Sequence, residues 1–198
     1  MKKVGILGGT FNPPHIGHLM MANEAYHALE LDEVRFMPNA IPPHKKAYGA
    51  TDEQRKKMVE LAIADVPYFA LETYELERGG LSYTCDTMEA LKKREPDAQF
   101  YFIIGGDSID TLHKWYCIDK LVHYVKFIGL NRPGSEAKTD YPIKMVEAPE
   151  INLSSTIIRK RLASGGIYSN GRVIWIAKLC LIIYGQECQK SATCIQSV

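Results

Sequence analysis

The sequence has little of what marks a secreted, membrane-spanning or metal-clustered protein. Its 198 residues include five cysteines, an odd number without the paired spacing of a zinc site, so we expect neither a disulfide framework nor a metal cluster. No stretch approaches the ~20 apolar residues that span a bilayer, and the first apolar run is too short for a signal peptide. These absences predict a protein of the reducing cytoplasm without a membrane partner.

An excess of charge of one sign is also missing. The chain carries 24 Lys and Arg against 23 Asp and Glu, a formal net charge of +1. Such a chain has no whole-molecule field that would gather nucleic acid, so we expect no nucleic-acid partner. An anionic ligand would therefore be held by local groups. The length suits a single domain, 1–198, whose core is large enough to need no cross-links.

Short apolar runs alternate with helical patterns along the chain. Strands are expected at 4–7, 34–37, 69–72, 100–104, 125–130 and 143–146. Helices are expected at 17–29, at 51–64 behind a Thr51–Gln54 capping box, at 86–94, and after a cap at Ser154 or Ser155. This alternation predicts an α/β fold with a doubly wound parallel sheet.

The segment between the first strand and the first helix, residues 8–18, reads GGTFNPPHIGH. Gly8 and Gly9 let the backbone approach a ligand closely at the carboxyl end of a strand, where open α/β sheets bind their ligands. The following helix offers free N–H groups and a positive dipole end to a phosphate. His15 and His18 lie on one face of its opening turn and could donate hydrogen bonds to that phosphate.

The residues alone leave other interpretations of this segment open. Glycine-rich loops after strands are often plain turns, single histidines are more often structural than catalytic, and His-x-x-His is also a metal-binding pattern. No third ligand lies nearby in the sequence, so a phosphate site is favoured over a metal site. The spacing matches neither Gly-x-Gly-x-x-Gly nor the Walker pattern, which disfavours a redox-dinucleotide site and a P-loop.

A second segment, LSSTIIR at 153–159, combines a Ser/Thr-rich helix start with an arginine about one turn inside the helix. The N–H groups, the hydroxyls of Ser155 and Thr156 and the guanidinium of Arg159 could hold the outer phosphates of a triphosphate. By itself this segment is equally well a helix cap with a surface arginine. Its functional interpretation depends on the first segment.

The two segments together resemble the signatures of the nucleotidyltransferase superfamily, whose His-x-Gly-His tetrad is shared with class I aminoacyl-tRNA synthetases. Four further segments resemble bacterial nicotinate-nucleotide adenylyltransferases in the same order: NAIPPHK at 39–45, SYTCDT at 82–87, GGD at 105–107 and KWY at 114–116. The resemblance covers residues 1–164. It implies a Rossmann-like nucleotidyltransferase fold. It also implies transfer of the adenylyl group of ATP to nicotinic acid mononucleotide, giving deamido-NAD and pyrophosphate in NAD biosynthesis.

The resemblance also implies roles for single residues. Charge stabilisation would fall to His15, His18 and Arg159. The ATP site would comprise Gly8, Gly9, Thr10, Phe11, His15, His18, Gly105, Asp107, Ser155, Thr156, Ile158 and Arg159. The mononucleotide site would comprise Asn39 and Lys45 at the phosphate, Asp107 at a ribose hydroxyl, Trp115 stacked on the pyridine ring beside Tyr116, and the N–H groups of Tyr83 and Thr84 at the nicotinate carboxylate. Structural alternatives stay open: Trp115 as core, Lys45 as a solvated charge, and 82–87 as a helix cap.

The implied reaction is an in-line attack of the mononucleotide phosphate on the α-phosphorus of ATP, without a general base or a covalent intermediate. Mg²⁺ bound mainly through ATP oxygens would help to neutralise the phosphates, and no residue is assigned as a metal ligand. The sequence leaves open the choice between nicotinate and nicotinamide mononucleotide, and whether the chain forms a homo-oligomer.

Other protein classes fit less well. Pantetheine-phosphate adenylyltransferases and cytidylyltransferases share the first segment but give no reason for the Ser-Tyr-Thr and Trp-Tyr elements. A class I tRNA synthetase would be much longer and would carry a Lys-rich second motif. A non-enzymatic nucleotide-binding module stays open, and it would bind ATP without releasing pyrophosphate.

The tail at 165–198 departs from the resemblance. Glu187 is its only acidic residue, and 173–184 is almost entirely apolar, which is typical of a buried closing helix or strand. Family members usually continue here with a Leu-Pro-like turn and a polar helix that ends near Gly-Leu-Tyr, and no part of the tail aligns with these. The alternatives are a divergent or disordered tail and a change of reading frame near residue 165.

Overall fold

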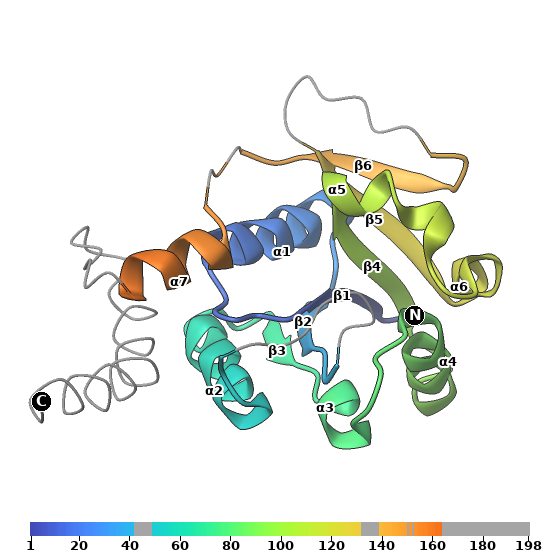
Figure 1. Cartoon of the computed structure of the whole chain (residues 1–198). Coiled ribbons are helices and arrows are strands. Elements are labelled where there is room, and N and C mark those ends of the chain that lie inside the picture. The colour runs from blue at the N-terminus through green and yellow to red at the C-terminus, as the bar shows by residue number, and fades with distance from the viewer. Residues whose placement is uncertain (42–48, 132–138, 150, 152, 164–198) are drawn as a thin grey trace, which may run out of the picture.

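The computed structural model (Figure 1) describes residues 1–41, 49–131, 139–149, 151 and 153–163. Lys45, expected at the mononucleotide phosphate, and the tail 165–198 lie outside the described residues. The predictions made for them therefore stay predictions. Among the residues that the structure describes, no helix is both long enough and apolar enough to cross a membrane.

The six strands of the described chain form one sheet in the order β3-β2-β1-β4-β5-β6, and every neighbouring pair is parallel. Their bounds are β1 (Lys3–Gly9), β2 (Glu33–Pro38), β3 (Phe69–Leu71), β4 (Gln99–Gly105), β5 (Val125–Asn131) and β6 (Ile143–Glu147). The two central strands, β1 and β4, pair with Ile6 beside Phe102. The predicted α/β fold with a doubly wound parallel sheet is confirmed, and each expected strand is present.

Helices separate the strands from β1 to β5. The described helices are α1 (Ile16–Leu29), α2 (Asp52–Ile63), α3 (Tyr74–Arg78), α4 (Thr84–Arg94), α5 (Gly106–Ile109), η1, a 3₁₀ turn (Leu112–Lys114), α6 (Ile118–Tyr124) and α7 (Ser155–Ala163). The sequence predicted α1, α2, α4 and α7, although α4 begins two residues before the expected start. It did not predict α3, α5 or α6, which have 5, 4 and 7 residues and are too short to show a helical repeat.

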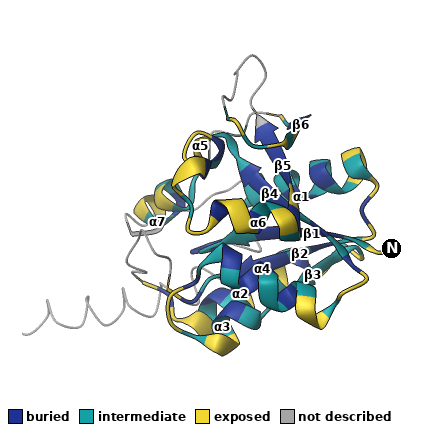
Figure 2. Ribbon diagram, turned by 90° about the vertical axis from the view of Figure 1, so that its right-hand side faces the viewer, coloured by how far each residue is buried: buried dark blue, intermediate teal, exposed yellow. Residues whose placement is uncertain are grey.

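Helices lie on both faces of the sheet, and much of the ribbon between them is coloured as buried (Figure 2). Successive side chains of β4 point to opposite faces of the sheet, and those of Phe102, Ile103 and Ile104 are all buried because both faces are covered. Phe100 and Phe102 pack in a cluster with α4 and α6, whereas Ile103 packs in a second cluster with α1 and α2. Two apolar layers therefore hold the sheet, as a doubly wound fold requires.

Side chains cap two of the predicted helices. The Thr51 hydroxyl accepts from the Gln54 N–H at 3.2 Å, and the Gln54 side chain accepts from the Thr51 N–H at 2.8 Å, so the predicted capping box is present. At the start of α7 the Ser154 hydroxyl accepts from the Ile157 N–H at 3.3 Å. Of the two candidate caps, Ser154 is therefore the one that caps α7.

The order of the strands creates a crevice. β1 and β4 are neighbours, but the chain leaves β1 through α1 toward β2 and leaves β4 through α5 and α6 toward β5. Connections that diverge in this way leave a space at the carboxyl ends of the two strands, where such sheets bind ligands. Those ends are Gly9 and Gly105. The fold thus brings together two glycine-rich segments that are far apart in the sequence.

The capping box can be tested by stability. We expect Thr51→Ala to lower the free energy of unfolding by about 1 kcal/mol, because the Gln54 N–H at the start of α2 loses the hydroxyl that accepts from it. Thr51→Ser keeps the hydroxyl and should stay close to the parent. Urea unfolding of the three proteins measures the difference. Equal losses in both variants would mean that the hydroxyl bond does not contribute.

Candidate active site

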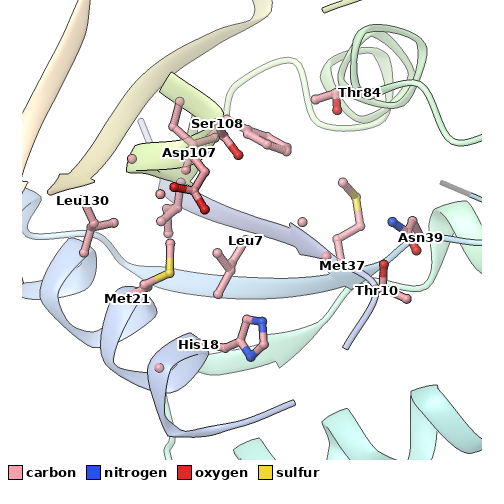
Figure 3. Close-up of a pocket in the computed structure, with 18 of the residues that line it drawn as sticks. Leu7, Thr10, His18, Met21, Met37, Asn39, Thr84, Asp107, Ser108 and Leu130 are labelled. Atoms are coloured by element: carbon pink, nitrogen blue, oxygen red, sulfur yellow. The ribbon is translucent and has the colours of Figure 1, made fainter. Parts of the chain in front are cut away.

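A cavity of about 1250 Å³ occupies the crevice at the carboxyl ends of β1 and β4. Figure 3 shows His18 from α1, Thr10 and Asn39 from the segments after β1 and β2, Thr84 from the start of α4, and Asp107 and Ser108 from α5 around one space. Twelve predicted site residues line it: Gly8, Gly9, Thr10, His15, His18, Asn39, Tyr83, Thr84, Gly105, Asp107, Trp115 and Tyr116.

The end of β1 leaves little room for side chains at its two last residues, Gly8 and Gly9. A Cβ on Gly8 would lie 3.0 Å from the Phe102 ring, and a Cβ on Gly9 would lie 3.2 Å from the Phe11 ring. Phe11 itself is 1% exposed, and its ring lies 5.0 Å from that of His18 and 5.8 Å from that of Phe36. The Phe11 side chain thus supports the loop from beneath and does not line the cavity, which leaves only its backbone for a ligand.

His15 and His18 form the start of α1. His15 is the N-cap, and its Nδ1 accepts from the Gly17 N–H at 3.2 Å. The Nδ1 of His18 accepts from the His15 N–H at 3.1 Å, and the ring centroids are 3.8 Å apart. An imidazole that accepts at Nδ1 carries its proton on Nε2 when it is neutral. Each ring is therefore fixed as an Nε2–H donor in the wall of the cavity.

The protein holds both rings neutral. Burial lowers the pKa of His15 from 6.5 to about 4. Burial, and then the nearby His15, lower the pKa of His18 from 6.5 to about 3. At neutral pH the pair therefore offers hydrogen-bond donors without a resident positive charge. A phosphate placed there would favour the charged rings and raise both pKa values.

The second predicted segment docks on the first. The Ser155 hydroxyl donates to the Pro13 carbonyl at 2.8 Å, and the Arg159 guanidinium donates to the Asn12 carbonyl and to the Thr156 hydroxyl. Ile158 is buried, with 3% of its surface exposed. The structure therefore brings 155–159 to the loop after β1, but these residues do not line the cavity, and Arg159 is engaged with backbone.

The start of α4 forms the opposite wall. Tyr83 is the N-cap and Thr84 the first helical residue, so their N–H groups belong to the helix end that lacks intrahelical partners. The Tyr116 ring lies 4.7 Å from that of Tyr83. Trp115 meets Phe102 edge-on at 5.8 Å and also lines the cavity, so it belongs both to the core and to the wall.

Glu75 lines the cavity as well, although sequence reasoning missed it. This carboxylate is 4% exposed and accepts from the Thr87 hydroxyl at 2.8 Å, which ties α3 to α4. Burial raises its pKa, and hydrogen bonds from Thr87 and Ser82 oppose that rise. Nothing in the segment YELER distinguishes Glu75 from Glu77, because only the tertiary fold buries one of them.

Comparison with known proteins gives a consistent picture. A family model described as cytidylyltransferase-like matches residues 6–161. The chain is 57% identical over 162 residues to the probable nicotinate-nucleotide adenylyltransferase of Bacillus cytotoxicus, covering 81% of this chain and 86% of that protein. It is 55% identical over 167 residues to the probable enzyme of that name from Lactiplantibacillus plantarum, covering 83% and 78%. For the nicotinate-nucleotide adenylyltransferase of Bacillus subtilis the values are 52% over 165 residues, covering 83% and 87%.

Solved structures share the fold. The chain superposes on Plasmodium falciparum nicotinic acid mononucleotide adenylyltransferase complexed with NaAD, with a TM-score of 0.71, 22% identity, and 84% of this chain and 87% of that chain covered. For the same enzyme complexed with APC the TM-score is 0.75 at 20% identity, with 93% and 96% covered. At such identities the likeness shows the fold alone, and it confirms the Rossmann-like nucleotidyltransferase architecture.

The histidine pair makes a pH prediction. We expect the free protein to titrate His15 near pH 4 and His18 near pH 3, well below the usual 6.5, because burial disfavours both imidazolium ions. Both pKa values should rise when a non-hydrolysable ATP analogue binds. NMR of the imidazole nitrogens as a function of pH measures this. Ordinary pKa values for the pair in the free protein would contradict the neutral-donor arrangement.

Proposed function

This chain belongs to the cytidylyltransferase-like family and, within it, to the nicotinate-nucleotide adenylyltransferases, and we propose how its residues perform that reaction. The enzyme transfers the adenylyl group of ATP to the phosphate of nicotinic acid mononucleotide, releasing pyrophosphate in NAD biosynthesis. One observation carries the residue assignment. The neutral histidine pair and the start of α4 line the same cavity at the switch point of the sheet.

ATP would occupy the side of the cavity formed by the loop after β1. Backbone at Gly8, Gly9 and Thr10 can approach the nucleotide closely, and the Nε2–H groups of His15 and His18 would donate to the phosphate oxygens that gain charge during transfer. Such preorganised donors act without the cost of reorienting at the moment of reaction. Gly105 and Asp107, at the end of β4 and in α5, complete this side.

Nicotinic acid mononucleotide would occupy the side formed by Asn39, α4 and the 115–116 segment. Tyr83 and Thr84 would receive the nicotinate carboxylate at the α4 N-terminus, where the helix dipole also favours an anion. Trp115 would stack on the pyridine ring beside Tyr116, and Asp107 would accept from a ribose hydroxyl. Asn39 would bind the phosphate, with Lys45 kept as the second predicted phosphate ligand.

The chemistry then needs alignment more than proton transfer. The attacking phosphate is already ionised, so an in-line attack on the α-phosphorus requires neither a general base nor a covalent intermediate. Arg159 would contribute when the outer phosphates of ATP replace the Asn12 carbonyl as its acceptor. That exchange is favourable because a hydrogen bond between ionised groups is stronger than one to a neutral carbonyl. Ser155 and Thr156, at the start of the same helix, are proposed for the same phosphates.

A divalent cation fits the electrostatics of this cavity. Among its described lining residues, the acidic Glu75, Asp107 and Asp110 outnumber Lys114, the one side chain there with a permanent positive charge. In the described part of the chain, no group of three or more His, Cys, Asp or Glu side chains could hold a metal ion. We therefore propose that Mg²⁺ is held mainly through ATP oxygens, where it would neutralise phosphate charge.

We also propose that residues 1–198 form a single domain, that the protein is cytoplasmic and that it binds no nucleic acid. Size-exclusion chromatography with light scattering would establish whether it forms a homo-oligomer.

Asparagine substitutions test the histidine donors without disturbing the helix start. Asn places an acceptor where Nδ1 lies and is a favoured N-cap, but it lacks the Nε2–H donor. We expect His15→Asn and His18→Asn each to lower kcat by about 10²-fold. The matched control is His27→Asn, at the exposed far end of α1, which should keep the parent kcat. Near-parent turnover in both cavity variants would exclude the donor role.

The choice of acceptor tests the mononucleotide site. Nicotinate offers a carboxylate to the N–H groups at the start of α4, whereas the nicotinamide NH₂ would face donors and lose partners of its own. Two such bonds are worth about 3 kcal/mol, or roughly a hundredfold in kcat/KM in favour of the acid. Pyrophosphate release with each mononucleotide, under identical ATP and magnesium, measures the ratio.

Two outcomes of that assay would contradict different parts of the proposed function. A preference for the amide, or equal values, would overturn the assignment of the carboxylate to Tyr83 and Thr84 and leave adenylyl transfer intact. No pyrophosphate with either acceptor, from protein that still binds ATP, would favour the nucleotide-binding module instead.

A further inference from the structure

The buried guanidinium of Arg55 is a polar feature that the proposed reaction does not use. Arg55 lies one turn inside α2, and its side chain is 0% exposed. Its carboxylate partner, Asp52, has a side chain that is 52% exposed and lies 2.6 Å away. A buried charge is costly unless hydrogen bonds satisfy it, so the other contacts of this group show what holds it there.

Those contacts reach two separate loops. Nη1 donates to the Thr10 carbonyl at 2.9 Å, in the loop after β1. Nη2 donates to the Asn39 carbonyl at 2.5 Å and lies 3.4 Å from the Ala40 carbonyl, in the segment after β2. The planar guanidinium presents several donors in a fixed fork, so it can hold both loops at once, which an ammonium cannot.

The two loops belong to different halves of the cavity. Thr10 and Asn39 both line it, and the proposed function assigns Thr10 to ATP and Asn39 to the mononucleotide phosphate. The Asn39 N–H also donates to the Gly9 carbonyl at 3.0 Å, so the loops meet directly beside the guanidinium. Among the described residues, no donor reaches the buried Asn39 Oδ1.

We propose that Arg55 is a positioning residue that fixes the ATP loop and the mononucleotide loop at one separation. This inference rests on the proposed function. It follows from the geometry of in-line transfer, in which the attacking oxygen must stay aligned with the α-phosphorus. A shift of about 1 Å between reacting groups can cost about 10²-fold in rate. Arg55 acts through the two loops and does not touch either substrate.

Arg55→Lys tests this role, because lysine keeps the charge and loses the fork. We expect kcat at saturating substrates to fall by about 10²-fold, with much smaller changes in either KM. Arg55→Met, which fills a similar volume without donors, should show the same split. The matched control is Arg35→Lys in β2, a second largely buried arginine that bonds Glu33, Glu72 and Glu95 away from the cavity. It should lower Tm and leave the kcat of folded enzyme unchanged.

Hydrogen exchange provides a readout independent of turnover. In Arg55→Lys the Asn39 amide should exchange faster at temperatures well below Tm, while in Arg35→Lys it should exchange as in the parent. An Arg55→Lys protein with parental kcat, or with parental exchange at Asn39, would overturn the proposal. If the parent releases no pyrophosphate, the proposed function fails, and exchange at Asn39 still decides whether Arg55 holds the two loops together.

Discussion

The reversal of strand order between β1 and β4 is the constraint on which the site depends. Parallel strands place their carboxyl ends at one edge, and only at the reversal do the following connections diverge and leave that edge open. The glycines at the end of β1, the start of α1 and the start of α5 all lie at this edge. A substrate phosphate placed in the opening is therefore surrounded by backbone N–H groups and helix ends, although the chain carries almost no net charge.

The electrostatics of the cavity follow from local groups. His15 and His18 are held neutral by burial, and the helix start that they cap fixes which nitrogen can donate. Since the ionised side chains in the described lining are mostly acidic, a polyanion gains little from fixed positive charge there. Neutral donors and helix dipoles can bind a phosphate without burying permanent charges in the cavity wall, which would be costly without partners.

Apolar periodicity predicted the strands and the long helices, and glycine-histidine spacing predicted Gly8, Gly9, His15 and His18 at the cavity, because these are local signals. The rest of the twelve predicted residues that line the cavity came from the resemblance to the family. Sequence reasoning missed α3, α5 and α6, since helices of two turns or fewer carry no readable repeat. It also missed Glu75 and Arg55, whose neighbours in the chain look alike and whose burial is decided by contacts across the fold. The Arg159 contact with the Asn12 carbonyl could not be read from the sequence either, since it joins residues 147 positions apart.

A loop that approaches its ligand through backbone cannot hold itself in place. The glycines at the end of β1 supply no side chain to pack, so this end of the strand and the loop that follows depend on groups from elsewhere that bind their carbonyls and N–H groups. Four carbonyls along this stretch accept from different parts of the chain: Gly9 from the Asn39 N–H, Thr10 from Arg55 in α2, and Asn12 and Pro13 from Arg159 and Ser155 in α7. The Phe11 ring fills the space beneath. The segment 153–159, far along the chain, is thus part of the support of the loop after β1.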